Sequence, residues 1–127
     1  MKIEVNNSAT VVIRSRRIWN ETEIEIQKHE EYVFEADGLW RDLTISCDAD
    51  GYTNSYMMRL FDRFKRSQSG TWFALIGSMD KDNDFLIGKK KWIVFQQSGL
   101  LFCYANDVKG FYWNNSGEVS LKITRLR

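Results

Sequence analysis

The sequence has no proline, one histidine and two cysteines among 127 residues. Without proline, every turn has to be made by Gly, Asn, Asp or Ser. With His29 as the only histidine, nucleophilic and metal-hydrolytic mechanisms lack parts. No Gly-x-Ser-x-Gly elbow, phosphate-binding glycine loop or His-Glu-x-x-His pair occurs either. We therefore expect a protein that is not an enzyme, and only catalysis by a pair of its 17 carboxylates stays open.

The two cysteines, Cys47 and Cys103, are too far apart in sequence for a Cys-x-x-Cys pair and do not match a zinc site. Both lie in segments where apolar residues alternate, which favours buried free thiols. A disulfide is the alternative, and it requires the two segments to be neighbouring strands.

The sequence also lacks an excess of charge of either sign, and it lacks long apolar runs. Eighteen basic residues face 17 acidic ones, for a net charge of +1. This balance disfavours nucleic acid as a partner and gives no basis for attraction to anionic membranes. No apolar run approaches the roughly 20 residues of a membrane helix, so we expect no membrane insertion. Because the sequence turns polar after five residues, no signal peptide is indicated. The expected location is the cytoplasm, with release without a cleaved signal as an alternative.

What the sequence does have is sheet-forming residues in one domain-sized stretch, residues 1–127. Hydrophobic residues make up 43% and aromatic residues 14% of the chain. Short segments of alternating polarity, separated by Gly, Asn, Asp and Ser turns, predict roughly eight or nine strands. This pattern indicates an all-β, antiparallel β-sandwich with two sheets of about four strands each. The predicted strands are residues 10–13, 22–27, 31–35, 43–47, 72–76, 84–87, 92–95, 100–104 and 118–124.

Residues 56–66 differ from the rest because Met57, Leu60, Phe61 and Phe64 recur at helical spacing. Arg and Lys fill the other face. The pattern predicts one short helix, or a helical turn, on the rim of the sandwich. A basic and aromatic nucleic-acid patch is the alternative, which the neutral overall charge disfavours.

Three oxygen-rich stretches are candidates for calcium, which prefers carboxylate, amide and main-chain oxygens. Residues 80–84 begin like an EF-hand loop, but Phe85 stands where glycine is needed and Lys91 where glutamate belongs. A hairpin turn explains them better. Residues 48–54 contain Asp-Gly, which is first a turn signal, with the rim of a ligand pocket as the alternative.

The third stretch, residues 106–117, lies between two predicted strands. Asp107 offers a carboxylate, and Asn114 and Asn115 offer amide oxygens. Because adjacent side chains of a strand point apart, both amides can reach one ion only if the backbone bends there. Gly110 and Gly117 would let the loop fold back. The alternative is a long hairpin loop held by Asx-turns.

This third stretch resembles the calcium loop of the bacterial calcium-dependent galactose-binding lectins of the PA-IL type. The resemblance is carried by residues 106–108, Gly110, Tyr112 and residues 114–117, followed by an alternating terminal strand. It implies a jelly-roll-like sandwich of two antiparallel sheets, in agreement with the strand pattern. It also implies a bound Ca²⁺ that bridges the protein and a galactose-type carbohydrate, and a homo-oligomer is a further expectation.

The resemblance places the calcium ligands on the carboxylate of Asp107, the side chains of Asn114 and Asn115, and the carbonyl of Phe111. A further carbonyl falls on Asp42 by counting from Gly38, or on Trp40 if the loop differs in length. Asp107, Asn114 and Asn115 would then also contact the sugar, whose hydroxyls complete the calcium shell. Tyr52 is the predicted aromatic contact with the sugar, with Trp40 or Trp113 as alternatives.

The sequence also departs from that family. The His- and Gln-containing loop that contacts the sugar in the family has no counterpart, and the basic, aromatic residues 56–66 occupy roughly that region. A second hypothesis therefore stays open: a non-enzymatic protein-interaction or structural sandwich that has lost sugar binding. An exposed apolar patch would be typical of such a domain.

Overall fold

Alternation of buried and exposed residues builds the strands of this protein. In β2 (Asn20–Ile26) every second side chain is buried, and β10 (Asn115–Arg125) alternates in the same way along most of its length. One face of each strand therefore packs inward and the other meets solvent. The computed structural model describes residues 1–53, 55 and 57–127, with the side chains of residues 57 and 58 left aside.

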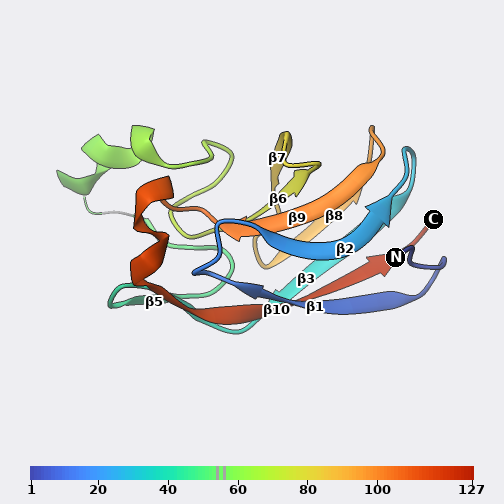
Figure 1. The fold of residues 1–127 in the computed structure, drawn as a ribbon, viewed down its shortest axis with the longest axis horizontal. Coiled ribbons are helices and arrows are strands. Elements are labelled where there is room, and N and C mark those ends of the chain that lie inside the picture. Colours follow the sequence, from blue (N-terminus) through green and yellow to red (C-terminus); the bar gives the residue numbers. More distant parts are fainter. Residues whose placement is uncertain (54, 56) are drawn as a thin grey trace.

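The strands form two antiparallel sheets that face each other, which confirms the predicted all-β sandwich (Figure 1). One sheet has six strands in the order β5-β4-β10-β3-β8, with β1 also paired to β10, and the other has four in the order β2-β9-β6-β7. The remaining strands are β1 (Ser8–Arg14), β3 (Glu31–Asp37), β4 (Trp40–Asp42), β5 (Ile45–Cys47), β6 (Leu75–Met79), β7 (Asn83–Leu86), β8 (Lys90–Val94) and β9 (Gly99–Ala105).

The last strand, β10, organises the larger sheet. It pairs with β1 on one side, and β3 and β4 pair with successive parts of it. Between the sheets lies a core of aliphatic and aromatic side chains that includes Tyr32, Phe34 and Trp40, each at most 1% exposed. The edges and faces of the aromatic rings contact one another, as for Trp40 and Phe73 with centroids 5.7 Å apart.

The predicted count of about four strands in each sheet is wrong for the larger sheet. The prediction missed β4, which has only three residues and no room for an alternating pattern. Residues 43–47 were predicted as one strand, but only Ile45–Cys47 is a strand. The strand predicted at residues 72–76 begins only at Leu75, because the residues before it turn through Phe73, whose φ is 62°.

The predicted short helix exists as the 3-10 helix η1 (Met57–Phe64) at one end of the sandwich. Tyr56, at which the predicted helix began, lies outside the described residues. A second 3-10 helix, η2 (Lys109–Asn114), lies inside the stretch that was predicted as a loop. The two 3-10 helices and β5 stand at the end opposite the chain termini (Figure 1).

The turn predicted at residues 80–84 is confirmed for residues 80–82, since Asn83 and Asp84 already belong to β7, and the turn predicted within residues 48–54 lies at Ala49 and Asp50. Asp80 and Lys81 have positive φ values at the tip of the β6–β7 hairpin. In the second turn the N–H of Gly51 donates to the carbonyl of Asp48. Asn54 lies outside the described residues.

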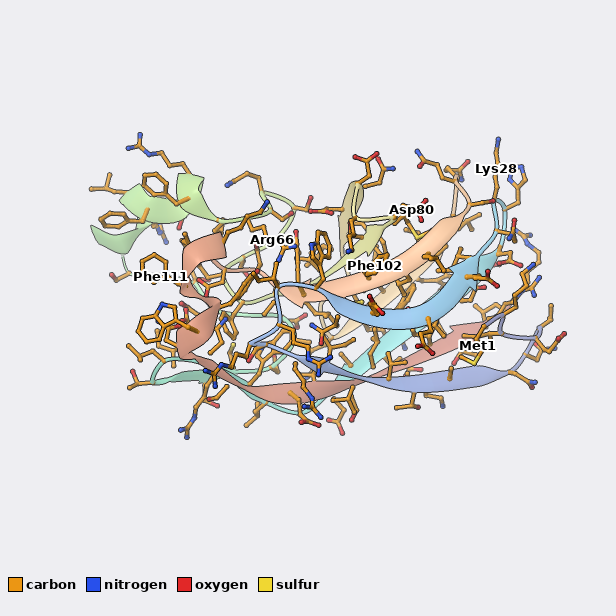
Figure 2. The ribbon with its side chains drawn as sticks, in the orientation of Figure 1. Met1, Lys28, Arg66, Asp80, Phe102 and Phe111 are labelled. Atoms are coloured by element: carbon orange, nitrogen blue, oxygen red, sulfur yellow. The ribbon has the colours of Figure 1, made fainter. Side chains whose placement is uncertain are left out.

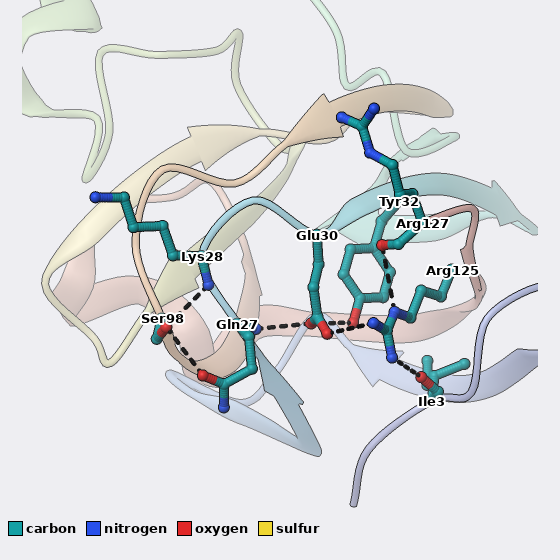
Figure 3. Close-up of polar contacts among 8 residues, drawn as sticks. All are labelled: Ile3, Gln27, Lys28, Glu30, Tyr32, Ser98, Arg125 and Arg127. Carbon is teal, nitrogen blue, oxygen red and sulfur yellow. Dashed lines mark hydrogen bonds and ion pairs between the residues drawn. The ribbon is translucent and has the colours of Figure 1, made fainter.

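At the terminal end, a buried ion pair ties the two ends of the chain to the larger sheet (Figure 3). Arg125 Nη2 lies 2.8 Å from Glu30 Oε2, and Arg125 Nη1 donates to the carbonyl of Ile3. The hydroxyl of Tyr32 donates to Glu30 Oε1, so the carboxylate has both oxygens in use.

Cys47 and Cys103 are free and buried, as predicted. Burial raises the pKa of the Cys47 thiol to about 11, which keeps it protonated and unreactive at neutral pH. In the described part of the chain, no helix is both long and apolar enough to cross a membrane.

Candidate functional site

The predicted site residues come together at the end of the sandwich that carries η1 and η2. Asp42 ends β4 and is the partner of Asn115, the first residue of β10. Asp107 follows β9 and is buried beneath the η2 turn, where it is 4% exposed. Asp42, Asp107 and Asn114 line one pocket of about 510 Å³. Sheet register and a single helical turn therefore gather oxygen-bearing groups from three parts of the chain.

The backbone bend that the two adjacent amides require lies at the junction of η2 and β10. Asn114 ends the 3-10 helix, and Asn115 is already extended with φ −85° and ψ 151°. The change of direction lets neighbouring side chains avoid the opposite orientations that a continuous strand would impose. Gly117 follows with φ 84°, and a Cβ there would lie 3.0 Å from the Cα of Trp40. Gly110 has no such requirement, because nothing lies within 4 Å of its Cβ position.

Three oxygen atoms in this site are buried and have no hydrogen-bond partner. They are Oδ2 of Asp107, Oδ1 of Asn114 and Oδ1 of Asn115. Buried polar atoms are normally hydrogen-bonded, and leaving one unpaired costs about 1–3 kcal/mol. In two of these groups the other polar atom is engaged: Asp107 Oδ1 accepts from the N–H of Val108, and Asn115 Nδ2 donates to the carbonyl of Ser15. The unpaired atoms are therefore all acceptors, which is the chemistry of a cation site.

The charges around Asp107 also favour a cation site. Burial raises the pKa of the Asp107 carboxyl, the N–H of Val108 lowers it, the like charge of Asp42 raises it again, and the neighbouring Asn115 side chain lowers it. Two carboxylates that repel each other in a buried pocket are stabilised by a cation between them. Burial and a hydrogen bond of 2.5 Å to Asp42 also raise the pKa of the Tyr52 hydroxyl far above its ordinary value. Tyr52 therefore stays protonated and donates to Asp42.

Within the described residues, no three His, Cys, Asp or Glu side chains form a group able to hold a metal. A divalent ion here would depend on two acidic residues, two amides and main-chain carbonyls. That mixture suits calcium, which accepts six to eight oxygen ligands, and does not suit zinc. On the chemistry of the donor set, the residues present fit a calcium ion.

Aromatic residues form the walls of the pocket above these oxygen atoms. They are Tyr52, Phe61, Phe64, Trp72 and Phe111. Trp72 Nε1 donates to Asp62 Oδ1 at 2.6 Å, which fixes η1 against the pocket. The floor is polar and the walls are apolar, a combination typical of pockets for small ligands.

The three aromatic residues predicted as possible sugar contacts lie in different places. Tyr52 lines the pocket beside Asp42. Trp40 is 1% exposed and donates from Nε1 to the carbonyl of Phe73, so its ring packs in the core. The alternative prediction that Trp40 contacts the sugar is therefore wrong. Trp113 is exposed but is not part of the pocket lining. Phe111 lines the pocket with its side chain as well as lying in η2.

Two bulky residues beside the pocket have left-handed backbones. Leu43 (φ 56°) follows Asp42, and Phe73 (φ 62°) follows Trp72. Such conformations cost on the order of 1–3 kcal/mol each and persist only where the surroundings enforce them. Here the N–H of Leu43 donates to the carbonyl of Asn114, and the N–H of Phe73 to the carbonyl of Asn106. These hydrogen bonds tie both strained residues to the segment 106–114.

Asn106 supports the site and is not a ligand in it. Its side chain is fully buried, and its Nδ2 donates to the carbonyls of Ser67, Gly70 and Thr71 at 2.8–3.1 Å. Its Oδ1 accepts from the N–H of Ser67. In the sequence Asn106 is only a polar residue in a predicted loop, so nothing there distinguished its structural role from that of a ligand.

Arg66 is a second support that the sequence did not reveal. Its guanidinium carbon lies 3.6 Å from the ring centroid of Tyr104 and 4.2 Å from that of Trp19 (Figure 2). Nη1 donates to the hydroxyl of Tyr112, which in turn donates to the carbonyl of Ala105. The main-chain N–H of Arg66 donates to the carbonyl of Asp107. Arg66 thus holds both ends of the segment that carries the unpaired oxygens.

Among solved structures, the chain is similar to the N-terminal domain of EclA, described as a PllA-like lectin. The TM-score is 0.71 at 16% sequence identity, over 91% of this chain and 94% of that chain. This chain has the fold of a PllA-like lectin. The predicted resemblance to PA-IL-type lectins is thereby confirmed, and at this identity it concerns the fold. No protein-family profile and no curated protein sequence matches the chain.

Phe61, Phe64 and Trp72 also line the pocket, although the sequence did not predict them as site residues. Their alternation and spacing resembled those of ordinary packing residues, so no signal in the sequence marked them.

Proposed function

We propose that this protein binds carbohydrate through a calcium ion, and that its ligand is galactose or a galactoside. The observation that carries the proposal is the set of three buried acceptor atoms on Asp107, Asn114 and Asn115 that lack hydrogen-bond partners. The lectin-like fold and the loop resemblance support it independently.

In this proposal Asp107, Asn114 and Asn115 hold the ion with side-chain oxygens, and Phe111 and Asp42 contribute main-chain carbonyls. A bound calcium supplies open coordination positions that two sugar hydroxyls fill. Asp107, Asn114 and Asn115 also contact those hydroxyls. Tyr52 fixes the Asp42 carboxylate by its hydrogen bond and offers an aromatic wall to the apolar face of the sugar. Weak binding at one site would gain strength from several copies through effective concentration.

A calcium titration by calorimetry, followed by a galactose titration with and without chelator, tests the proposal. We expect calcium binding, a raised melting temperature, and galactose binding that chelator abolishes. Asp107→Ala should remove all three, because it deletes the carboxylate whose Oδ2 is unpaired.

The matched control is Asp82→Asn in the exposed β6–β7 turn, the stretch that begins like an EF-hand loop. It should leave calcium binding unchanged. A melting temperature that does not respond to millimolar calcium would refute the proposal and leave the alternative, a sandwich that binds a protein partner.

A further inference from the structure

The exposed phenylalanine side chains of this chain gather around the candidate pocket. Phe61 and Phe64 of η1 and Phe111 of η2 are each about half exposed, and the neighbouring Leu60 and Trp113 are 78% and 66% exposed. We call these five residues the aromatic rim. They come from two elements at the end of the sandwich farthest from the termini, where Phe111 is labelled in Figure 2. Apolar surface of this kind marks a docking site.

Basic residues are interleaved with the rim. Arg59 and Arg63 are exposed on η1, Lys65 follows it, and Lys109 begins η2. The acidic residue of η1, Asp62, is engaged by the indole of Trp72. Exposed cations thus lie beside the apolar rings, although the net charge of the whole chain is only +1. The carboxylates of Asp42 and Asp107 line the pocket, where Asp107 is buried and Asp42 is half-buried, so the cations are the more exposed charges beside the rim.

Phe, Trp and Leu next to Arg and Lys are the composition of segments that lie in the interface of a lipid bilayer. The apolar rings enter the boundary between headgroups and acyl chains, and the cations meet anionic phosphates. The local charge therefore favours lipid, which the overall charge of the sequence did not reveal.

We propose that the aromatic rim docks onto an anionic phospholipid surface and so presents the pocket to glycans carried at that surface. The proposed lipid contact depends only on the aromatic rim and its cations, and not on the proposed function. The choice of a membrane-borne glycan as ligand rests on the proposed function. No part of the chain has to span the bilayer, since only side chains of the rim enter its interface.

The test is sedimentation with vesicles of phosphatidylcholine, with and without phosphatidylglycerol, in chelator and without any glycolipid. With the exposed cations at the surface, we expect binding on the order of tenfold to 100-fold tighter to the anionic vesicles, weakening as salt is added. The double substitution Leu60→Ser and Trp113→Ser should abolish sedimentation with both vesicle types. Arg59→Glu with Arg63→Glu should remove only the preference for anionic vesicles.

Trp92→Ser is the control, because Trp92 is 67% exposed on β8, outside the rim. It should sediment as the unmodified protein does. Asp107→Asn separates the two proposals: it should lose the calcium response and keep vesicle binding. Equal binding to both vesicle types, or an equal loss in Trp92→Ser, would overturn the lipid proposal. A dimer in solution that the Leu60 and Trp113 substitutions dissociate, without vesicle binding, would assign the rim to a second copy and also overturn it.

Discussion

Asp107 shows how one residue can be costly to the fold and necessary to the site. Its carboxylate is buried, has one oxygen unpaired and lies close enough to Asp42 to feel its charge. A structure built only for stability would place an amide or an apolar group there. The persistence of the buried charge agrees with a role in binding a cation.

Replacing Asp107 with Asn should raise the melting temperature of the calcium-free protein by a few degrees at neutral pH. Folding raises the pKa of this carboxyl, so the folded chain holds the proton to higher pH than the unfolded chain does. The contribution of Asp107 to the free energy of unfolding therefore falls as pH rises above the ordinary carboxyl value. Melting curves of both proteins in chelator should converge in acid and separate toward neutral pH.

With saturating calcium the order should reverse, because only the unmodified protein gains stability from the ion. Calcium at about 100 times its dissociation constant adds about 2.7 kcal/mol. A variant less stable than the unmodified protein in chelator would contradict this account of Asp107.

Asn106 gives a second prediction for a single residue. Asn106→Ala should lower the free energy of unfolding by about 2–4 kcal/mol, because it leaves several buried main-chain groups without partners. Urea denaturation measures this. Asn83→Ala, which removes one exposed hydrogen bond to Gln97, should change the free energy by less than about 0.5 kcal/mol.

Among the elements, the 3-10 helix η2 depends on its neighbours as well as on its own hydrogen bonds. No side chain caps its first turn, and short 3-10 segments are intrinsically weak. Arg66 and Tyr112 supply the missing support through the chain of hydrogen bonds to Ala105. The positions of the Phe111 carbonyl and the Asn114 side chain thus depend on Arg66, which lies 46 residues before Tyr112 in the chain.

Arg66→Met should weaken calcium binding by about tenfold or more, the effect typical of groups that orient metal ligands. Methionine keeps the apolar packing on Tyr104 and Trp19 but removes the hydrogen bond to Tyr112. Calorimetric calcium titration measures the change. Arg66→Lys should restore part of the affinity, since an ammonium can still donate.

For the whole molecule, the sandwich separates a stabilising end from a binding end. The ion pair of Glu30 and Arg125 closes the end with the termini, and the pocket lies at the other (Figures 1 and 3). Two well-packed sheets lie between the two ends. Stability and calcium affinity should therefore vary independently.

Arg125→Met tests that independence. It leaves the carboxylate of Glu30 buried without its counter-ion and should cost about 3–5 kcal/mol of unfolding free energy. The calcium dissociation constant, measured below the new melting temperature, should stay the same within error. A large loss of calcium affinity in this variant would show that the two ends are coupled.

Much of the fold followed from local pattern. The alternation in residues 22–27 and 118–124 predicted β2 and β10, because a period of two is what a half-buried strand requires. The helical spacing in residues 56–66 predicted η1. Three-residue β4 and the turn at Phe73 escaped prediction, since such short elements are decided by their partners and not by their own residues.

The sequence by itself determined the all-β class, the turns marked by Gly, Asn, Asp and Ser, and the chemistry of the loop, because periodicity, turn residues and side-chain type are local properties. Only the tertiary structure decided which oxygens are buried together. In the folded chain Asp42 pairs with Asn115, and the backbone bends before β10. Asn106 forms buried hydrogen bonds to main-chain groups, and Phe61 and Phe64 line the pocket. These relations join residues far apart in the chain, and contacts at that separation are set by the packing of whole sheets.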